Sequence, residues 1–422
     1  MSTGAAAAAA STTSKIDYSC TPENMAEARV GSGKVALFCQ EAPGGITYRI
    51  PALLYLPQES IFLAFAEKRS SFRDEDAEFL VMRRGHKEGM SVQWGPKEPL
   101  TTALLPGHRT MNPCPVYEKT SGQVFLFFIC VQRHISEWHQ IMSRKNAARL
   151  CFVSSQDGGY TWSQLTDLTD QVIGHDLRNW ATFAVGPGHG LQMSCGRLVI
   201  PAYAYYMHWS FFAPSSVNNI KPHCFIFYSD DHGKNWAWGQ LLKSLHTIEC
   251  QVAELTSQDN EQVLYCNARS PDKYRVEAFS VDYGTEFEES FLCKELPETG
   301  TGCQGSVVSF TPVLQPSELD RRENTSALET TKPWMVFSHP ASRHRRINLG
   351  IYLNTSPHVK ESWEDPWVLY EGPSGYSDLA VCEDGQSLLF GCLFECGVSN
   401  EIEEIAFQLF TDADLLRNVK ED

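Results

Sequence analysis

A short motif recurs three times along the chain and constrains the possible folds more than any other feature. Its copies are 155–162 (SQDGGYTW), 229–236 (SDDHGKNW) and the weaker 280–287 (SVDYGTEF), and each follows an apolar run. In the shared pattern, S-x-D-x-G-x-(T/N/E)-(W/F), the Asp accepts hydrogen bonds from backbone N–H groups of its own turn, and the Gly adopts a positive φ. The aromatic ring anchors the returning strand. The motif predicts a repeated structural turn rather than a catalytic one.

The segments between these turns are short and apolar. Runs of strand length occur at 61–66, 78–83, 123–130, 148–154, 197–204, 224–229, 262–268, 306–310, 334–338, 387–393 and 405–410. Long apolar stripes of helical period are scarce, and many short strands with turn signals are typical of an all-β sandwich, barrel or propeller. The motif copies begin 74 and 51 residues apart, roughly the length of a propeller blade. This spacing favours radial repetition.

The chain divides into a lead-in and one large domain. We expect residues 1–44 to form a disordered tail and lead-in, and residues 45–415 to form a single β-propeller. The polar stretch 315–332 (QPSELDRRENTSALETTK) predicts a flexible insertion within that domain. The N-terminal residues lack the basic and apolar regions of a signal peptide, and no run reaches the roughly 20 apolar residues that span a bilayer. Neither a signal peptide nor a transmembrane segment is expected.

The net charge of −16 excludes several modes of binding. A chain this acidic repels polyanions, which argues against nucleic-acid partners and against docking on anionic lipid through a polybasic patch. An anionic ligand would need a local cluster of arginines, because salt screens charges beyond roughly 8 Å.

Fourteen cysteines are scattered without regular spacing. Cys130, Cys151, Cys266 and Cys392 lie within apolar runs, which favours buried, reduced thiols. A zinc site at Cys392 and Cys396 with a distant His lacks a second ligand pair. We therefore expect neither a metal nor a cofactor.

Six further motifs carry a resemblance to a known family. They are YRIP (48–51), FAEKR (65–69), MNP (111–113), ECQ (249–251), NAR (267–269) and GYSDL (375–379). With the repeated turns, known there as Asp boxes, they make the chain resemble the exo-α-sialidases from about Tyr48 to about Phe410. The chain looks most similar to the vertebrate cytosolic and plasma-membrane-associated type. The stretches 105–113 and 390–396 look like the ganglioside-preferring form.

The resemblance implies a six-bladed β-propeller and a retaining exo-α-sialidase that hydrolyses terminal sialic acid from glycoconjugates, with gangliosides as the expected substrates. Its partners would be sialylated glycolipids or glycoproteins, and its location the cytoplasm or the periphery of the plasma membrane. A sialoglycan-binding lectin, a protein-binding scaffold and a trans-sialidase are the alternatives. A scaffold would need no carboxylate-binding arginines, and a lectin would need no catalytic groups.

The family's three-arginine clamp corresponds to Arg49, Arg269 and Arg346. Sialic acid carries a carboxylate on its anomeric carbon, and arginine recognises a carboxylate through two parallel hydrogen bonds. Arg343 and Arg345 lie close to the third position. Arg346 is preferred because it stands immediately before the run INLGIY, where the family places its arginine.

The resemblance assigns catalysis to Tyr376, Glu249 and Asp74. A neutral phenol avoids the repulsion that a carboxylate nucleophile would meet at a carbon bearing a carboxylate, and sialidases are known to use tyrosine. Phenol is a weak nucleophile and needs an adjacent base, here Glu249. Asp74 would be the acid/base, although Glu75 and Asp76 beside it leave a plain acidic loop as the alternative. These roles predict highest activity below neutral pH.

The remaining candidates would line the sugar pocket or support it. Arg69, Asn112, Tyr203, Tyr205 and Gln304 are expected to line it, Glu67 to orient an arginine, and Glu137 to reach the glycerol side chain of sialic acid. For Tyr203 and Tyr205, aromatic packing across strands is the alternative.

An aromatic stretch follows these tyrosines at 206–214 (YMHWSFFAP). Its Trp209, Phe211 and Phe212 either pack on one another in a surface loop or contact the lipid around a glycolipid headgroup.

Overall fold

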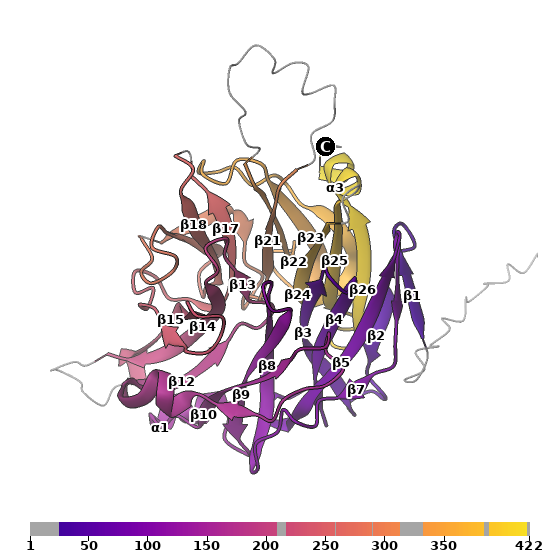
Figure 1. Cartoon of the computed structure of the whole chain (residues 1–422). Helices are drawn as coiled ribbons and strands as arrows, with labels where there is room; N and C mark the ends of the chain where they lie inside the picture. The colour runs from indigo at the N-terminus through magenta and orange to yellow at the C-terminus, as the bar shows by residue number, and fades with distance from the viewer. Residues whose placement is uncertain are drawn as a thin grey trace, which may run out of the picture.

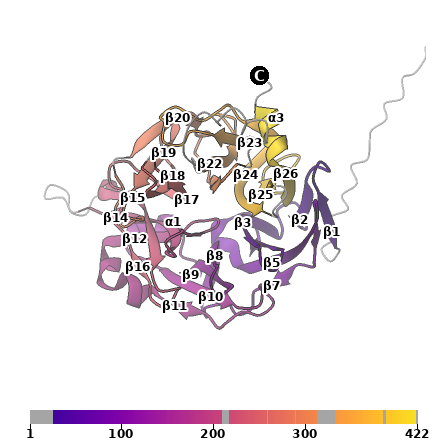
Figure 2. The same ribbon diagram turned by 45° about the horizontal axis from the view of Figure 1, so that its top comes forward.

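The computed structural model describes residues 25–208, 217–257, 259–288, 290–312, 332–383 and 388–419. Within these residues the strands form five hydrogen-bonded antiparallel sheets, which Figure 2 shows arranged in a ring. The all-β, propeller-like fold predicted from the sequence is confirmed. The helices that accompany it are short (Figure 1).

The first three sheets follow one another along the chain. The first contains β1 (Ala26–Arg29), β3 (Thr47–Leu56), β4 (Ile61–Arg69), β5 (Ala77–Glu88), β6 (Ser91–Trp94) and β7 (Glu98–Pro99) in the order β1-β6-β5-β4-β3, with β7 beside β5. The second contains β8 (His108–Glu118), β9 (Gln123–Gln132), β10 (Ala148–Ser155) and β11 (Thr166–Asp167) in the order β11-β10-β9-β8. The third contains β12 (Trp180–Val185), β13 (Leu191–Gln192), β14 (Leu198–Met207), β15 (Ile220–Ser229) and β16 (Ala237–Trp238).

The last two sheets close the ring. The fourth contains β17 (Ile248–Thr256), β18 (Gln262–Arg269), β19 (Tyr274–Ser280) and β20 (Phe291–Pro297). The fifth has seven strands in the order β2-β26-β25-β24-β23-β22-β21: β2 (Val35–Cys39), β21 (Ser306–Phe310), β22 (Trp334–Pro340), β23 (Ile347–Asn354), β24 (Trp367–Glu383), β25 (Leu388–Cys396) and β26 (Glu404–Thr411). Helix α1 (Glu137–Ser143) follows β9, α3 (Asp412–Val419) follows β26, and short helical turns lie at Asp74–Asp76, Thr169–Ile173, Gly174–Asn179 and Val217–Asn219.

The expected strand positions are confirmed, because all eleven predicted runs overlap an observed strand. The ordered fold begins earlier than expected. Strands β1 and β2 precede residue 45 and pair with β6 and β26. Each has only four or five residues, too few to show a clear alternation in sequence. The pairing of β2 with β26 joins an N-terminal strand to the last strand in the described residues. The predicted insertion lies outside the described residues, apart from Lys332.

The Asp-box turns have the predicted geometry. In the second copy, Asp231 Oδ1 accepts a hydrogen bond from Asn235 N at 2.8 Å, and Ser229 Oγ accepts one from Gly233 N at 2.9 Å. Gly233 has a φ of +83°, and a Cβ on it would lie 2.3 Å from Cζ of Phe125 in the preceding sheet. The glycine therefore serves both the turn and the contact between sheets.

All three turns occupy the same place in their sheets. They follow β10, β15 and β19 and lead to β11, β16 and β20. Gly159 and Gly284 also have positive φ and also face apolar side chains of the preceding sheet, Leu63 and Ile226 respectively. The repeated motif thus packs each of these three sheets against the sheet that precedes it in the chain.

Asp378 connects the inner strands of the ring. Its carboxylate is fully buried. One oxygen accepts hydrogen bonds from Leu53 N at 2.7 Å and His189 N at 3.0 Å. The other accepts one from Ser306 Oγ at 2.8 Å and lies 2.7 Å from His189 Nδ1. A single carboxylate therefore links β3, the segment before β13, β21 and β24.

The cysteines Cys130, Cys151, Cys266 and Cys392 are buried free thiols, as predicted. Cys39 differs from that expectation, because it is disulfide-bonded. In the described part of the chain, no helix is long and apolar enough to cross a membrane.

Candidate active site

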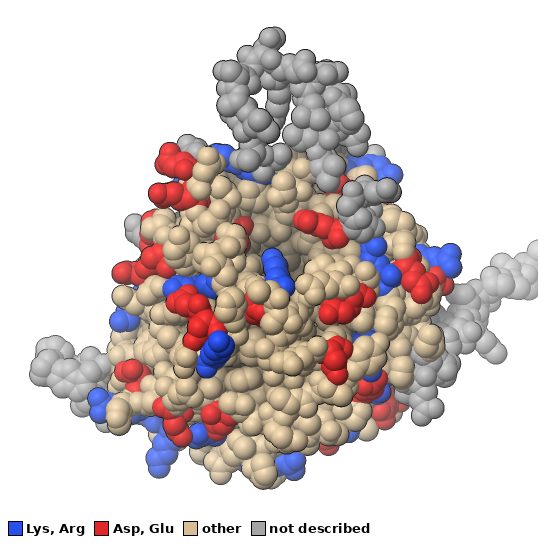
Figure 3. All heavy atoms as spheres, viewed as in Figure 1, with Lys and Arg blue, Asp and Glu red and all other residues tan. Residues whose placement is uncertain are grey.

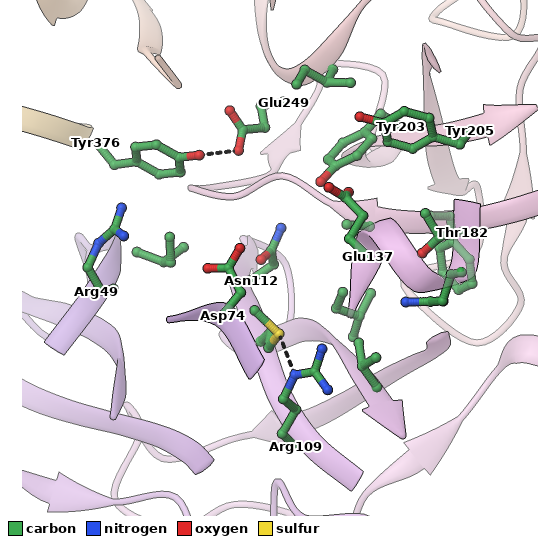
Figure 4. Close-up of a pocket in the computed structure, with 18 of the residues that line it drawn as sticks. Arg49, Asp74, Arg109, Asn112, Glu137, Thr182, Tyr203, Tyr205, Glu249 and Tyr376 are labelled. Carbon is green, nitrogen blue, oxygen red and sulfur yellow. Dashed lines mark hydrogen bonds between the residues drawn. The ribbon is translucent and has the colours of Figure 1, made fainter. Parts of the chain in front are cut away.

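A cavity of about 400 Å³ opens at one end of the inner strands (Figure 4). Eleven of the thirteen side chains proposed from the sequence line it. These are Arg49, Arg69, Asp74, Asn112, Glu137, Tyr203, Tyr205, Glu249, Arg269, Arg346 and Tyr376. The other two, Glu67 and Gln304, lie behind its wall. The pocket gathers residues from every sheet of the ring.

Three of the inner strands have irregular backbone where they border this cavity. Ile50 in β3, Asn112 in β8 and Glu249 in β17 have φ of +60°, +58° and +43°, although none is a glycine. Each lies at a register shift in its strand. Bulges redirect side chains, and strained backbone of this kind is concentrated at functional sites.

Tyr376, Glu249 and Arg269 form one hydrogen-bonded group. The Tyr376 hydroxyl donates to Glu249 Oε1 (Figure 4). Arg269 Nη1 donates to Glu249 Oε2 at 2.7 Å and to the Tyr376 hydroxyl at 3.2 Å. Burial and the charge of Glu249 raise the pKa of Tyr376 well above its ordinary value, against the opposing effect of Arg269. The phenol is thus neutral at rest and in contact with a carboxylate that can accept its proton.

Glu395 holds the other side of this group, and the sequence analysis did not identify it. Its carboxylate accepts hydrogen bonds from Arg49 Nε at 2.7 Å, Ile50 N at 3.0 Å and Tyr376 N at 3.1 Å. Burial raises the pKa of Glu395, but the charge of Arg49 outweighs this and leaves the pKa below its ordinary value. Glu395 therefore stays ionised and fixes Arg49 beside Tyr376. Glu395 lies in the stretch 390–396, whose resemblance to the family was the one indication in the sequence that this residue could matter.

Three arginines converge on the Tyr376 ring. The guanidinium carbons of Arg49 and Arg346 lie 5.6 and 5.3 Å from its centroid, and Arg269 contacts its hydroxyl. Arg346 also donates to Gly302 O at 3.0 Å. Arg343 and Arg345 are exposed and do not line the cavity, so Arg346 is the member of that run that faces the pocket.

Asp74 stands at the mouth of the cavity, with a side chain that is 67% exposed. Arg69 Nη1 donates to Asp74 Oδ1 at 2.6 Å. Burial raises the pKa of Asp74, but the charges of Arg69 and Arg49 outweigh it and lower the pKa below its ordinary value. Glu75 and Asp76 do not line the pocket. Of the acidic run, only Asp74 faces the cavity.

Glu67 is buried behind Arg69. One of its oxygens accepts hydrogen bonds from Arg69 Nε at 2.9 Å and Nη2 at 2.6 Å, and the other accepts one from Asn112 N at 2.6 Å. Glu67 therefore fixes two pocket residues without reaching the cavity.

Glu137 begins helix α1 and points toward Tyr203 (Figure 4). Burial raises the pKa of Glu137 to about 7, and the negative charges of Glu249 and Asp74 add to this effect. The Tyr203 and Tyr205 rings meet edge to face at 6.3 Å and both line the pocket. Both tyrosines lie in β14, so this contact runs along one strand and is not the packing across strands that was the alternative.

Gln304 differs from its expected position. Its side chain is buried and donates to Ser377 O at 3.0 Å and Pro187 O at 3.3 Å, while its oxygen accepts from Ser377 N at 3.0 Å. With the amide occupied in this way, Gln304 fixes the backbone beside Tyr376 instead of lining the cavity.

Part of the pocket wall was not predicted. One side is apolar and comes from β8, β9 and β12: Met111, Ile129, Val131, Phe183 and Ala184. Arg109, Gln140 and Thr182 add polar groups. Among the described residues, no cluster of three or more His, Cys, Asp or Glu side chains is arranged to hold a metal ion.

Comparisons with known proteins agree with this fold and pocket. Residues 61–389 match the family described as "BNR repeat-like domain". The fold resembles that of a Hadza microbial sialidase, with a TM-score of 0.67 at 20% identity over 90% of this chain and 69% of the other. A ring of sheets with BNR repeats is therefore the class to which the chain belongs.

Its relatives define the family more closely. Sialidase-3 of Bos taurus is 52% identical, covering 92% of this chain and 94% of the relative. Sialidase-3 of Homo sapiens is 51% identical, covering 94% of this chain and 97% of the relative. The chain belongs to the sialidase family of enzymes.

Proposed function

We propose that this sialidase is a retaining exo-α-sialidase in which Tyr376 is the nucleophile. The observation that carries the proposal is the contact of the Tyr376 hydroxyl with both Glu249 and Arg269, beside a ring that Arg49 and Arg346 also approach. A phenol hydrogen-bonded to a carboxylate has its base in place. Arg49, Arg269 and Arg346 supply the planar donors that a carboxylate on the anomeric carbon requires.

The reaction proceeds in two displacements. Glu249 accepts the Tyr376 proton while the phenolic oxygen bonds to the anomeric carbon, and Asp74 gives its proton to the departing glycosidic oxygen. Asp74 then accepts a proton from water, whose oxygen displaces the tyrosine, and Glu249 returns its proton to the phenolate. The substrate carboxylate adds negative charge near Asp74 and so favours the protonated form that the first step needs.

We also propose six blades in one propeller domain that begins at β1. Support comes from β24, which has 17 residues. Between Trp367 and Pro373 it pairs with β23, and between Ser374 and Glu383 it pairs with β25. Division of the seven-stranded sheet at this change of partner gives two four-stranded units, each of which uses part of β24.

Gangliosides are the substrates we propose, in a peripheral contact with the plasma membrane. Apolar side chains stand exposed around the cavity mouth: Trp138 and Met142 on the outer face of α1, and Phe72 two residues before Asp74. Trp138 is 69% and Phe72 55% exposed. Exposed aromatic rings beside a pocket favour a lipid-borne substrate, because they can enter the headgroup region. Trp209, Phe211 and Phe212, proposed for the same role, lie outside the described residues.

A fluorogenic α-sialoside tests the reaction. We expect turnover, with sialic acid released first as the α-anomer and detected by NMR. Binding without turnover would indicate a lectin, and transfer to an added galactoside in preference to water would indicate a trans-sialidase.

A comparison of substrates tests the contact with lipid. Replacement of both Trp138 and Met142 by Ser is expected to lower activity on ganglioside micelles while sparing a small soluble sialoside. Equal activity of the variant and the wild type on micelles would contradict the proposal.

A further inference from the structure

Arg109 is a buried arginine in the pocket wall that the proposed reaction does not use. It lies in β8, is 2% exposed, and lines the cavity. Its Nη1 donates to Gln132 O at 3.0 Å and its Nη2 to Ile135 O at 2.8 Å, while Nε points to Met111 Sδ at 3.2 Å. Figure 4 shows the guanidinium below the segment that carries Glu137. One of these hydrogen bonds thus ends on the last residue of β9, and the other on the loop between β9 and α1.

Helix α1 packs against β12, and the hydrogen bonds of the helix itself are mostly local. It has only seven residues, far too few for a stable helix without tertiary support. Ser136 caps its first turn by accepting from His139 N at 3.0 Å. In the middle of the helix, the buried Gln140 side chain accepts a hydrogen bond from Ala147 N at 2.7 Å. These two hydrogen bonds are local, whereas the side chain of Arg109 reaches across from the neighbouring strand, beside a backbone hydrogen bond from Arg133 N to Gly107 O at 3.1 Å.

The position of α1 decides what reaches the cavity. Its first residue, Glu137, lines the pocket beside Tyr203, and Gln140 lines it one turn later. A shift of this short helix would move both side chains together. The loop 132–135 sets where α1 begins, and Arg109 binds both ends of that loop.

We propose that Arg109 is a positioning residue that holds the 132–135 loop, and through it Glu137, against the bound sugar. This inference rests on the proposed function. The planar guanidinium matches two carbonyl oxygens at once, whereas a lysine ammonium on a flexible stem offers a point charge. A positive charge alone is therefore not sufficient to hold the loop. We expect Arg109→Lys to lose the simultaneous hydrogen bonds to Gln132 O and Ile135 O.

A direct contact with substrate is the competing role, because the guanidinium has five N–H donors and three of them have partners here. A double-mutant cycle separates the two roles. It compares kcat and KM on a soluble sialoside for wild type, Arg109→Lys, Glu137→Gln and the double variant. Loss of a hydrogen bond made by the charged Arg109 guanidinium, or of the Glu137 contact that it positions, lowers kcat/KM by about 10-fold. We expect each single variant to show this loss, mainly in KM, and the double variant to be no worse than either.

Arg133→Ala is the matched control. Arg133 lies in the same loop but is exposed, and its side chain makes only a 3.4 Å contact with His108 O. We expect wild-type kinetics from this variant. Losses that multiply to about 100-fold in the double variant would overturn the proposal in favour of an independent contact. So would an unchanged Arg109→Lys or an unchanged Glu137→Gln.

Hydrogen exchange supplies a readout that does not depend on catalysis. In Arg109→Lys, peptides covering 132–147 should exchange faster than in wild type, while peptides from β14 and β24 should be unchanged. Unaltered exchange in 132–147 would overturn the positioning role even if activity fell. If Arg109→Lys does not fold, Arg109→Gln is the second variant, with the same expected result. A wild type inactive on every sialoside would refute the proposed function, while the exchange measurement would still decide whether Arg109 holds the loop.

Discussion

The two ends of the propeller sheets use polar side chains in opposite ways. In the Asp-box turns, each Asp and Ser bonds to backbone groups no more than four residues away. In the pocket, by contrast, Arg269 contacts Tyr376 across 107 positions of sequence, and Arg49 contacts Glu395 across 346. The register of β9 with β10 shows the separation, since Ser155 pairs with Val124 whereas the pocket residue Val131 pairs with Ala148.

The Asp-box turns and the pocket also differ in how many hydrogen-bonding groups they leave available to a ligand. The Asp and Ser side chains of an Asp-box turn are satisfied within the turn. The turn as a whole packs against the preceding sheet and also accepts hydrogen bonds from it, as Gly159 O does from Arg84 Nη1 at 2.7 Å. In the pocket, by contrast, charged side chains make hydrogen bonds to one another but still direct some of their N–H groups into the cavity. Figure 3 shows cationic and anionic side chains interspersed over one face of the molecule. Polar groups closed on their own turn are structural, and polar groups that converge on a hollow from distant strands are functional.

The largest effect is expected where one atom carries the chemistry. Tyr376→Phe removes the phenolic oxygen that contacts Glu249 and Arg269. We expect kcat to fall by at least about 1,000-fold, the scale typical for loss of a covalent nucleophile. The melting temperature should stay close to that of wild type, because the ring and its packing remain. Near-normal turnover of the Phe variant would remove Tyr376 from the mechanism.

A smaller loss is expected from Arg269→Lys. The arginine bonds Glu249, the Tyr376 hydroxyl and Thr301 O together, with the last at 2.9 Å. A lysine cannot reproduce this fork, and loss of a buried charge contact costs about 2–5 kcal/mol, or roughly 30-fold or more in binding. The measurement is the affinity for sialic acid relative to its carboxamide analogue. Equal affinity of the wild-type protein for both would show that no carboxylate clamp exists.

At the Asp-box end the effect should fall on stability alone. Gly233→Ala places a Cβ 2.3 Å from Phe125 Cζ at a φ of +83°. Overpacking and backbone strain together are expected to lower the free energy of unfolding by about 3 kcal/mol, measured by urea denaturation. Activity per folded molecule should be unchanged. As a control, Gly196→Ala introduces the same strain at a φ of +95° without a nearby atom, so its destabilisation should be smaller. A large loss of kcat in folded Gly233→Ala would contradict the conclusion that the Asp-box turns contribute to stability and not to activity.

The same contrast explains what the sequence could predict about the fold. The Asp boxes were predicted correctly because each is complete within eight residues. The apolar runs located eleven strands. Strands β8 and β24 were not among them, because Pro113, Pro115 and Pro373 interrupt their apolar patterns. In β8, the pairing register shifts between Met111 and Cys114. Pro113 and Pro115 lie on either side of Cys114, where this shift ends.

For the pocket, motifs located side chains but not their surroundings. A motif fixes a residue's neighbours in sequence, which is why Arg49, Glu249 and Tyr376 could be proposed. It does not tell which face of a strand a side chain takes, so Gln304 was placed in the cavity although its amide is bound to the Ser377 backbone. Arg109 lies in the stretch 105–113 noted above, but its role could not be predicted from that stretch, because its hydrogen-bond partners lie 23 and 26 positions away.

The smallest effect we predict concerns the pH dependence at Glu137. Burial, with the charges of Glu249 and Asp74, raises the pKa of Glu137 to about 7, above the ordinary value of 4.5. The side chain is therefore mostly neutral at pH 6 and mostly ionised at pH 8. Ionisation places one more negative charge beside a pocket that binds a carboxylate. At about 4 Å in a water-like medium such repulsion costs about 1 kcal/mol, or roughly fivefold in affinity.

For the wild type we therefore expect kcat/KM on a soluble sialoside to fall by roughly fivefold between pH 6 and 8, in addition to the decline that follows loss of the proton on Asp74. Glu137→Gln has no charge to gain, and its profile should lack this step. Glu75→Gln is the matched control, because Glu75 is an exposed carboxylate next to Asp74 that does not line the cavity. It should keep the wild-type profile. A step that persists in Glu137→Gln, or disappears in Glu75→Gln, would mean that another group near the mouth titrates.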